Sequence, residues 1–413
     1  MRKETTMPNK CSFCNKTREE ATKLIISGAT AAICDECVEL CSNLLINQQN
    51  VNIKKDKKLA KHTNPIRIKQ YLDQFVIGQE DAKIAISVGV ANHYKRLFYT
   101  SAIAIEKSNI LLHGPTGTGK TLLAKTIADF LDVPFIIANA TGLTEAGYVG
   151  DDVESILSRL LLAADGDIEK AQHGIIFLDE IDKIGKKNDG STANRDITGE
   201  GVQQALLKII EGAVISVPTD GGKKHAGSSV VDIDTTGILF IASGSFVGLS
   251  DVITRRNKEN SIGFGSTKVN KVQSSTASVD DLIKFGMIPE FMGRFPVIVY
   301  TNVLTTPELI KVLTSTKNNL ISQYKFYFTI DGIEICFTQE ALESIAGKAS
   351  ILKTGARALK NILENSLMPH LFALPKYKEQ KVVEITFTAG VFNTNASPEF
   401  SYKSKAKQVL TAG

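Results

Sequence analysis

Residues 109–121 read Asn-Ile-Leu-Leu-His-Gly-Pro-Thr-Gly-Thr-Gly-Lys-Thr, an apolar run followed by a Gly-x-x-x-x-Gly-Lys-Thr loop. The run predicts a strand, and residues 122–131 predict a helix, which is the setting that identifies a P-loop. Glycines without Cβ atoms let the backbone turn tightly and direct its amide groups at phosphate oxygens. The helix N-terminus adds partial positive charge. The stretch therefore predicts a site for a nucleoside triphosphate.

Individual positions of this loop have distinct expected roles. Lys120 can reach the β- and γ-phosphates, and the Thr121 hydroxyl can ligate Mg²⁺. The expected ligands are thus ATP and Mg²⁺. The predicted nucleotide contacts are Gly114, Pro115, Thr116, Gly117, Thr118, Gly119, Lys120, Thr121 and Leu122.

A second motif follows some sixty residues later. Ile175-Ile176-Phe177-Leu178-Asp179-Glu180 predicts a buried strand that ends in two acids, the Walker B arrangement. Ligands of open α/β sheets bind at the C-terminal ends of the strands, so these carboxylates should face the P-loop. Asp179 can hold Mg²⁺, directly or through water. Glu180 is placed to orient and polarise the attacking water, since phosphoryl transfer depends mainly on positioning and charge.

Residues 238–245, Ile-Leu-Phe-Ile-Ala-Ser-Gly-Ser, predict a further buried strand that ends in small polar residues. Ser243 or Ser245 could contact the γ-phosphate or the attacking water. Ordinary turn chemistry at a strand end explains both serines nearly as well.

The N-terminal segment carries a metal-binding pattern. Cys11-x₂-Cys14 is followed after nineteen residues by Cys34-x₂-Cys37, which fits a four-cysteine structural zinc site. Four thiolates at this spacing can close a tetrahedral site, and metal binding then supplies the folding energy that so short a segment lacks. We predict Zn²⁺ at Cys11, Cys14, Cys34 and Cys37.

Composition sets the broad class of protein. The 413 residues are 43% apolar and 22% charged, which is typical of a globular chain with two or three domains. No uncharged apolar run approaches the roughly 20 residues that span a bilayer. The first residues lack the apolar segment of a secretion signal, so we expect a cytoplasmic protein that does not bind a membrane.

Charge is distributed unevenly along the chain. Residues 1–64 carry 11 Lys and Arg against 7 Asp and Glu, whereas residues 65–413 carry 37 of each sign. A motor acting on nucleic acid is expected to show a basic stripe along its channel. The neutral body argues against a nucleic-acid partner.

The pattern of elements predicts an α/β fold with the following organisation. Strand-like runs alternate with helical patterns from Pro65 onward, which favours a mainly parallel sheet. Residues 306–395 suggest helix (307–324), strand (333–337), helix (339–348), helix (356–372) and strand (382–387). The predicted domains are a zinc-binding domain at 8–50, a linker at 51–64, a large P-loop ATPase domain at 65–305, a small, mostly helical α/β domain at 306–395 and a loose tail at 396–413.

With these motifs in place, the chain resembles the AAA+ family, and within it the ClpX family of protein-unfolding ATPases, from Cys11 to about Phe387. The resemblance implies that Val76 and Ile77 lie nearest the adenine. It implies that Arg294 is an arginine finger reaching a neighbouring subunit's γ-phosphate, and that Arg357 is a sensor-2 residue of the same subunit. The segments that carry it are Tyr71–Gln79, Gly199–Leu207, Pro289–Pro296 and Gly355–Arg357.

Three further loops resemble working parts of the ClpX family. Gly147-Tyr148-Val149-Gly150 is similar to a pore loop, in which Tyr148 and Val149 would grip a translocated chain. Lys223, Lys224 and His225 resemble a basic loop at the channel mouth, which would attract carboxylate-ended tags. Ile262, Gly263 and Phe264 resemble the tripeptide that docks on a ClpP-type peptidase, and their apolar character is unusual in the polar stretch 257–278.

The resemblance implies a homohexameric ATPase that unfolds tagged proteins, with or without adaptors, and feeds them to a ClpP-type peptidase. Lys120, Asp179, Glu180 and Arg294 would be its catalytic residues. Three alternatives remain open. One is a P-loop ATPase that acts on nucleic acid, such as a clamp loader or helicase. The second is a remodelling chaperone that works without a peptidase, and the third is an ATP-binding scaffold without activity.

Overall fold

The computed structural model forms two compact units, Met1–His62 and Thr63–Gly413. The residues that it describes are 10–17, 25–27, 31–42, 63–99, 103–144, 151–185, 199–219, 230–259, 277–352, 354–394 and 396–402.

The N-terminal unit is small and depends on its cysteines. β1 (Ile25–Ser27) pairs antiparallel with β2 (Ala32–Cys34), and residues 35–42 are helical. Among the described residues of this unit, the buried core consists of Cys11, Ala32 and Cys34. A core of this size buries too little apolar surface to hold a fold together, which is the situation in which small domains use a metal.

A five-stranded sheet forms the centre of the second unit. Its order is β11-β3-β10-β7-β4, and every neighbouring pair is parallel. The strands are β3 (Ile110–His113), β4 (Phe135–Asn139), β7 (Ile175–Asp179), β10 (Leu239–Gly244) and β11 (Val297–Tyr300). β3 and β10 are buried at every position, as expected for parallel strands covered on both faces.

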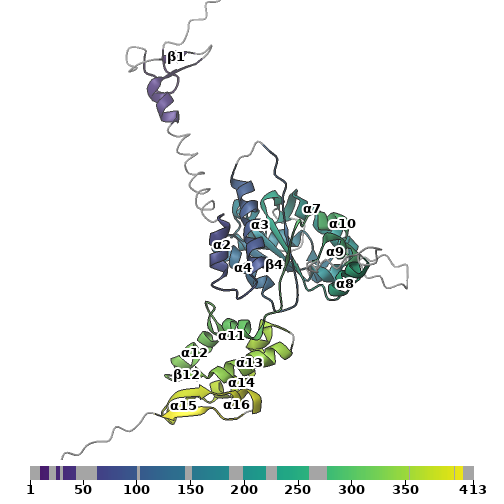
Figure 1. Ribbon diagram of the computed structural model, residues 1–413. Helices are drawn as coiled ribbons and strands as arrows, with labels where there is room; N and C mark the ends of the chain where they lie inside the picture. The colour runs from purple at the N-terminus through teal and green to yellow at the C-terminus, as the bar shows by residue number, and fades with distance from the viewer. Residues whose placement is uncertain are drawn as a thin grey trace, which may run out of the picture. The chain divides into compact units, whose positions relative to one another are not determined.

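Helices cover the sheet and place the P-loop. α3 packs against β11, α4 against β7 and β10, and α5 against β4. Figure 1 shows α2, α3 and α4 beside the sheet. The helices are α2 (Pro65–Leu72), α3 (Glu80–Phe98), α4 (Lys120–Leu131), α5 (Ser155–Ala163), α6 (Ile168–Gln172), α7 (Glu200–Glu211), α8 (Leu249–Glu259), α9 (Val279–Phe285) and α10 (Pro289–Gly293).

Short elements complete this part of the chain. The 3₁₀ turns are η1 (Ala140–Gly142), η2 (Ile181–Ile184) and η3 (Thr235–Gly237). β8 (Val214–Pro218) pairs antiparallel with β9 (Val230–Asp234), and β5 (Leu143–Thr144) pairs parallel with β6 (Asp151–Asp152).

The C-terminal elements have a hydrophobic core of their own, formed by Leu309, Phe328, Ile345, Leu363, Phe387 and their neighbours. They are α11 (Thr306–Thr314), α12 (Leu320–Ile330), β12 (Glu334–Phe337), α13 (Gln339–Ile351), α14 (Ala356–Phe372), α15 (Leu374–Glu379), β13 (Val382–Phe387), α16 (Ala389–Thr394) and β14 (Glu399–Tyr402). Figure 1 draws them in green to yellow. β13 pairs parallel with β12 and antiparallel with β14.

Two sequence expectations about this C-terminal part are wrong. The helix predicted over 307–324 is two helices, because Asn318 has a left-handed backbone and Asn319 caps α12 by accepting a hydrogen bond from the Ser322 amide. The stretch expected to be a loose tail contains β14, since the free edge of β13 offers it a pairing partner.

The predicted fold class is confirmed: an α/β body with a parallel sheet, a smaller α/β part and an N-terminal four-cysteine unit. Among the helices that the structure describes, none has the length and apolar character required to cross a membrane.

An ion pair joins α8 and α9 and yields a stability prediction. Arg256 donates to the fully buried carboxylate of Asp281 and, at 2.8 Å, to the Ser278 hydroxyl. Arg256→Ala leaves the carboxylate with neutral donors only, so the free energy of unfolding should fall by about 2–3 kcal/mol in urea denaturation. Arg255→Ala, at an exposed neighbouring position, should change it by less than about 0.5 kcal/mol. Equal losses of unfolding free energy in the two variants would contradict a stabilising role for the Arg256–Asp281 ion pair.

Candidate functional site

The P-loop has two positions that only glycine fits. Gly114 and Gly117 have φ values of +140° and +77°, a region that side chains disfavour. A Cβ on Gly114 would collide with the backbone of Thr301, and one on Gly117 with the carbonyl group of Thr354. The loop is therefore wedged between the segment after β11 and the segment before α14.

Lys120 begins α4 and lies at the centre of the site. Its ammonium group donates to the carbonyl oxygens of Gly114 and Pro115, at 2.7 and 2.8 Å. Burial lowers the pKa of Lys120 to about 8. Asp179 and Asp182 act against this shift, and the positive charge of Arg357 adds to it. Both Asp179 and Arg357 therefore lie within electrostatic range of the P-loop lysine. Thr121 follows it and is partly buried.

The two acids of the Walker B motif have different surroundings. Asp179 ends β7 and its carboxylate accepts the Glu180 amide at 2.9 Å. Glu180 has a left-handed backbone, with φ of +57°, which turns it away from the strand direction. Asn139, at the end of β4, donates its amide to Glu180 Oε2 at 3.3 Å. The sequence did not single out Asn139, although its register opposite Asp179 places it beside the acids.

The structure separates the two serines at the end of β10. The Ser245 hydroxyl donates to Asp182 Oδ2 at 2.9 Å, and the Ser245 and Phe246 amides donate to the same carboxylate. Ser245 thus fixes the turn after β10. Ser243 is fully buried, and its hydroxyl has no hydrogen-bond partner in the part of the chain that the structure describes. Of the two, Ser243 is the one whose hydroxyl group is not already engaged.

The beginning of α14 meets the P-loop directly. The Ala356 amide donates to the Gly117 carbonyl oxygen at 3.0 Å. A Cβ on Gly355 would lie too close to the same carbonyl, so this approach requires glycine on both sides. Arg357 follows Ala356 in the sequence, and it is exposed to solvent. The predicted sensor-2 residue is therefore close to the phosphate-binding loop.

Arg294 lies away from the P-loop of its own chain. Its carbonyl oxygen accepts the side-chain amide of Asn109, the residue before β3, whereas the P-loop follows the other end of β3. Its guanidinium group pairs with Glu211 at 2.8 Å on the surface, where both side chains are nearly half exposed. Surface pairs of this kind are weak and can be exchanged for another partner. Arg294 thus lies near the N-terminal end of β3, whereas its own P-loop follows the C-terminal end of the same strand.

The segment predicted to lie near the base approaches the P-loop. Val76 is buried, and its Cγ1 lies 3.9 Å from the place that a Cβ on Gly119 would take. Ile77 is partly buried beside it. The Gln79 side chain exchanges two hydrogen bonds with the backbone of Asn302, at 2.7 and 2.8 Å. Sequence reasoning missed Gln79, whose left-handed backbone at φ of +58° is visible only in the structure.

Cavities lie beside the P-loop and beside α4 in the part of the chain that the structure describes. One, of about 460 Å³, is lined by Pro115, Thr116, Thr118, Val303, Leu304, Leu309, Ala349, Ser350 and Gly355. The other, of about 330 Å³, is lined by Phe75, Leu122, Thr126, Val312, Lys317 and their neighbours. Both have walls from the P-loop or α4 and from the C-terminal elements, so the two parts of this unit jointly enclose space beside the nucleotide loop.

The four predicted zinc ligands converge in the N-terminal unit. The sulfur atoms of Cys11, Cys14, Cys34 and Cys37 all lie within 4.8 Å of one another. A tetrahedral site with Zn–S bonds near 2.3 Å requires sulfur atoms about 3.8 Å apart, so the group fits zinc. Burial raises the pKa of Cys11, but hydrogen bonds from the backbone of Cys14, Phe13 and Cys34 outweigh it and lower the value to about 6. Burial and hydrogen bonds with the other three cysteines raise the pKa of Cys37, so the four thiols do not all ionise by themselves, and a bound cation would favour the four thiolates.

Three predicted loops lie outside the described residues. They are the pore loop with Tyr148 and Val149, the basic loop with Lys223, Lys224 and His225, and the docking tripeptide Ile262, Gly263 and Phe264.

Three parts of the chain match known families. Residues 9–47 match the ClpX C4-type zinc finger, residues 105–298 match the AAA domain (Cdc48 subfamily), and residues 304–386 match the C-terminal, D2-small domain of ClpB protein.

Two curated relatives are similar over almost the whole length. They are the ATP-dependent Clp protease ATP-binding subunits ClpX of Borrelia duttonii (strain Ly) and Borrelia recurrentis (strain A1). Each is 46% identical over 396 residues, which cover 94% of this chain and 92% of the relative.

The shifted pKa of Lys120 yields a pH prediction. Near pH 8 about half of the free protein carries a neutral Lys120, because its pKa is about 8. Bound phosphate charges favour the ammonium form, so ADP binding should take up about half a proton at pH 8 and almost none at pH 6.5. ADP affinity should fall as the pH rises from 7 to 9. Titration calorimetry in buffers of different ionisation enthalpy measures both quantities.

The control for this measurement is Lys95→Met, which removes an exposed lysine of α3 that lines neither cavity. It should leave proton uptake unchanged, whereas Lys120→Met should abolish it. Binding without proton uptake between pH 7 and 9 in the unaltered protein would contradict the assignment.

Proposed function

Because this chain belongs to the ClpX family, we propose that it is an ATP-driven protein unfoldase that works as the ATP-binding subunit of a Clp protease. The chain is an AAA+ ATPase and not itself a peptidase, and its cofactors are ATP with Mg²⁺ and a structural Zn²⁺ ion. The observation that carries the proposal is the presence of Asp179 and Arg357 within electrostatic range of Lys120, in a chain 46% identical to ClpX subunits over 94% of its length. The Ala356 amide, next to Arg357, donates to the Gly117 carbonyl oxygen of the same P-loop.

The residues of the site have separate roles in hydrolysis. Lys120 and the P-loop amides hold the β- and γ-phosphates, and Thr121 with Asp179 holds Mg²⁺. Glu180 orients the attacking water and accepts its proton, with its own carboxylate steadied by Asn139. Pro115, Thr116, Thr118, Gly119 and Leu122 shape the loop around the triphosphate.

A neighbouring subunit completes the site. Arg294 lies at the opposite edge of the sheet from its own P-loop, so its guanidinium group cannot serve the same chain's nucleotide. In a homohexamer it would exchange Glu211 for the γ-phosphate of the next subunit and stabilise charge in the transition state. The need for a residue in trans supports a closed ring.

Movement would arise where α14 meets the P-loop. Arg357 contacts the nucleotide from the C-terminal domain, and the Ala356–Gly117 hydrogen bond ties that domain to the loop. A change of phosphate charge on hydrolysis therefore alters the contacts of both domains. In the proposed cycle the resulting change of domain angle moves Tyr148 and Val149 along the channel.

Other parts of the proposal rest on the family resemblance. Lys223, Lys224 and His225 attract tagged substrates or their adaptors at the channel mouth, and Ile262, Gly263 and Phe264 dock the ring on a ClpP-type peptidase. We also propose the domain limits 8–50, 65–305 and 306–395, with a linker at 51–64, and a cytoplasmic location.

Degradation of a folded, tagged reporter tests the proposal. With ATP and a ClpP-type peptidase, the chain should degrade the reporter, and deletion of residues 262–264 should abolish degradation while ATPase activity stays within about twofold. A matched deletion of residues 268–270 in the same stretch should leave degradation intact. Multiple hydrolysis events per domain are expected, since unfolding costs about 5–15 kcal/mol.

Two results would overturn the proposal. Unchanged degradation after removal of residues 262–264 would refute the docking role. ATPase activity that responds to DNA and not to unfolded protein would favour a nucleic-acid function instead.

A further inference from the structure

Lys83 is a buried cation outside the catalytic centre. It lies on the first turn of α3, and only 3% of its side chain is exposed to solvent. Burial of an ammonium group is costly unless charged and hydrogen-bonding partners surround it. Its partners therefore indicate which part of the structure this side chain fixes in place.

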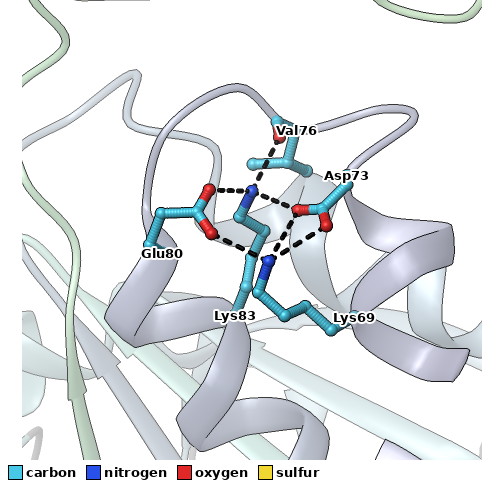
Figure 2. Close-up of polar contacts among 5 residues, drawn as sticks. All are labelled: Lys69, Asp73, Val76, Glu80 and Lys83. Carbon is cyan, nitrogen blue, oxygen red and sulfur yellow. Dashed lines mark hydrogen bonds and ion pairs between the residues drawn. The ribbon is translucent and has the colours of Figure 1, made fainter. Parts of the chain in front are cut away.

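The Lys83 ammonium group contacts three acceptor groups. It pairs with Asp73 Oδ1 at 2.5 Å and with Glu80 Oε1 at 2.7 Å, and it donates to the Val76 carbonyl oxygen at 3.4 Å. Figure 2 shows the ammonium group enclosed by these oxygen atoms, with the Val76 carbonyl on one side and the two carboxylates on the others. Lys83 thus ties α3 to the loop between α2 and α3.

A second lysine balances the charge. Lys69, on α2, pairs with Asp73 at 3.0 Å and with Glu80 at 2.8 Å, and it is partly exposed. Hydrogen bonds from Lys69 and Lys83 lower the pKa of Glu80. In Asp73 burial acts in the opposite direction, and the same two lysines still lower the pKa. The two carboxylates therefore stay ionised at neutral pH, and hydrogen bonds to Glu80 and Asp73 raise the pKa of Lys69. The described contacts of Lys69 are with the carboxylates, whereas Lys83 also holds the backbone of Val76.

The backbone of Val76 is fixed at both of its polar groups. Its amide donates to the Leu72 carbonyl oxygen at 2.8 Å, and its carbonyl oxygen accepts Lys83. The buried Val76 side chain then lies against the end of the P-loop at Gly119. The loop continues through Gly78 and Gln79, both with left-handed backbones, into α3. A small displacement at Val76 would shift the surface offered to the base.

We propose that Lys83 is a positioning residue for nucleotide recognition, which holds the Val76–Ile77 segment against the base without touching the nucleotide. This inference rests on the proposed function, because it requires that Val76 and Ile77 contact adenine. A buried ion pair is a weak source of stability, and an apolar side chain of similar size is often tolerated in its place. The network is therefore better explained by the precise placement of the loop than by stability.

The test compares ADP with inorganic pyrophosphate, which lacks the base. For Lys83→Met, which keeps the length of the side chain, the Kd of ADP should rise roughly tenfold, since a shift of about an ångström is enough to lose a contact of this kind. The Kd of pyrophosphate should stay within about twofold. Lys69→Met is the matched control: it removes a lysine from the same carboxylates but not from Val76, and it should leave both constants within about twofold.

Equal weakening of ADP and pyrophosphate in Lys83→Met would overturn the proposal, because it would indicate general damage to the site. Unchanged ADP binding would also overturn it. Failure of the proposed function would appear in the unaltered protein, as ADP binding no tighter than pyrophosphate binding.

A second variant covers the case in which Lys83→Met does not fold. Asp73→Asn alters a carboxylate that is 39% exposed and weakens the hold on Lys83 without removing the ammonium group. It should raise the Kd of ADP by roughly threefold and leave pyrophosphate binding unchanged. An ADP constant identical to that of the unaltered protein would refute the positioning role.

Discussion

The five central strands all run in the same direction, and this fixes which residues can lie beside the P-loop. Because all five run the same way, the P-loop after β3, Asp179 at the end of β7 and Ser243 near the end of β10 meet at one edge of the sheet. Asn109 holds Arg294 at the other edge, about 15 Å away along the strand. One chain therefore brings the P-loop and the Walker B acids together and holds Arg294 away from them.

Contacts around the P-loop tie this edge to the C-terminal elements. Ala356 donates to Gly117, and the Lys317 amide donates to the Gln74 carbonyl oxygen. Gln79 exchanges hydrogen bonds with Asn302, in the segment that leads from β11 to α11. The loop that carries Val76 is thus held by the charge network of Lys83 on one side and by the C-terminal elements on the other. The loop that carries Val76, the P-loop and the C-terminal elements are thus joined through backbone groups.

Local signals in the sequence were enough to predict the motifs and the main strands. Apolar runs identified β3, β7 and β10, and glycine or cysteine spacing identified the P-loop and the zinc ligands. Asn139 was missed because its partner Glu180 is 41 residues away, and Gln79 because Asn302 is 223 residues away. Such pairs depend on tertiary structure, as does β14, which forms only because β13 has a free edge. The ion-pair partners of Lys83, Asp73 and Glu80, are close to it in the sequence, yet no local sequence pattern predicts that its ammonium group is buried.

In the proposed ring, each hydrolytic site takes Glu180 from one subunit and Arg294 from the next. Co-expression of Arg294→Ala and Glu180→Gln chains tests it most directly, because each variant alone should be almost inactive. In an equal mixture about a quarter of the interfaces join an intact Glu180 to an intact Arg294, so the ATPase rate should recover toward about a quarter of the unaltered rate. A mixture no more active than the separate variants would contradict the claim.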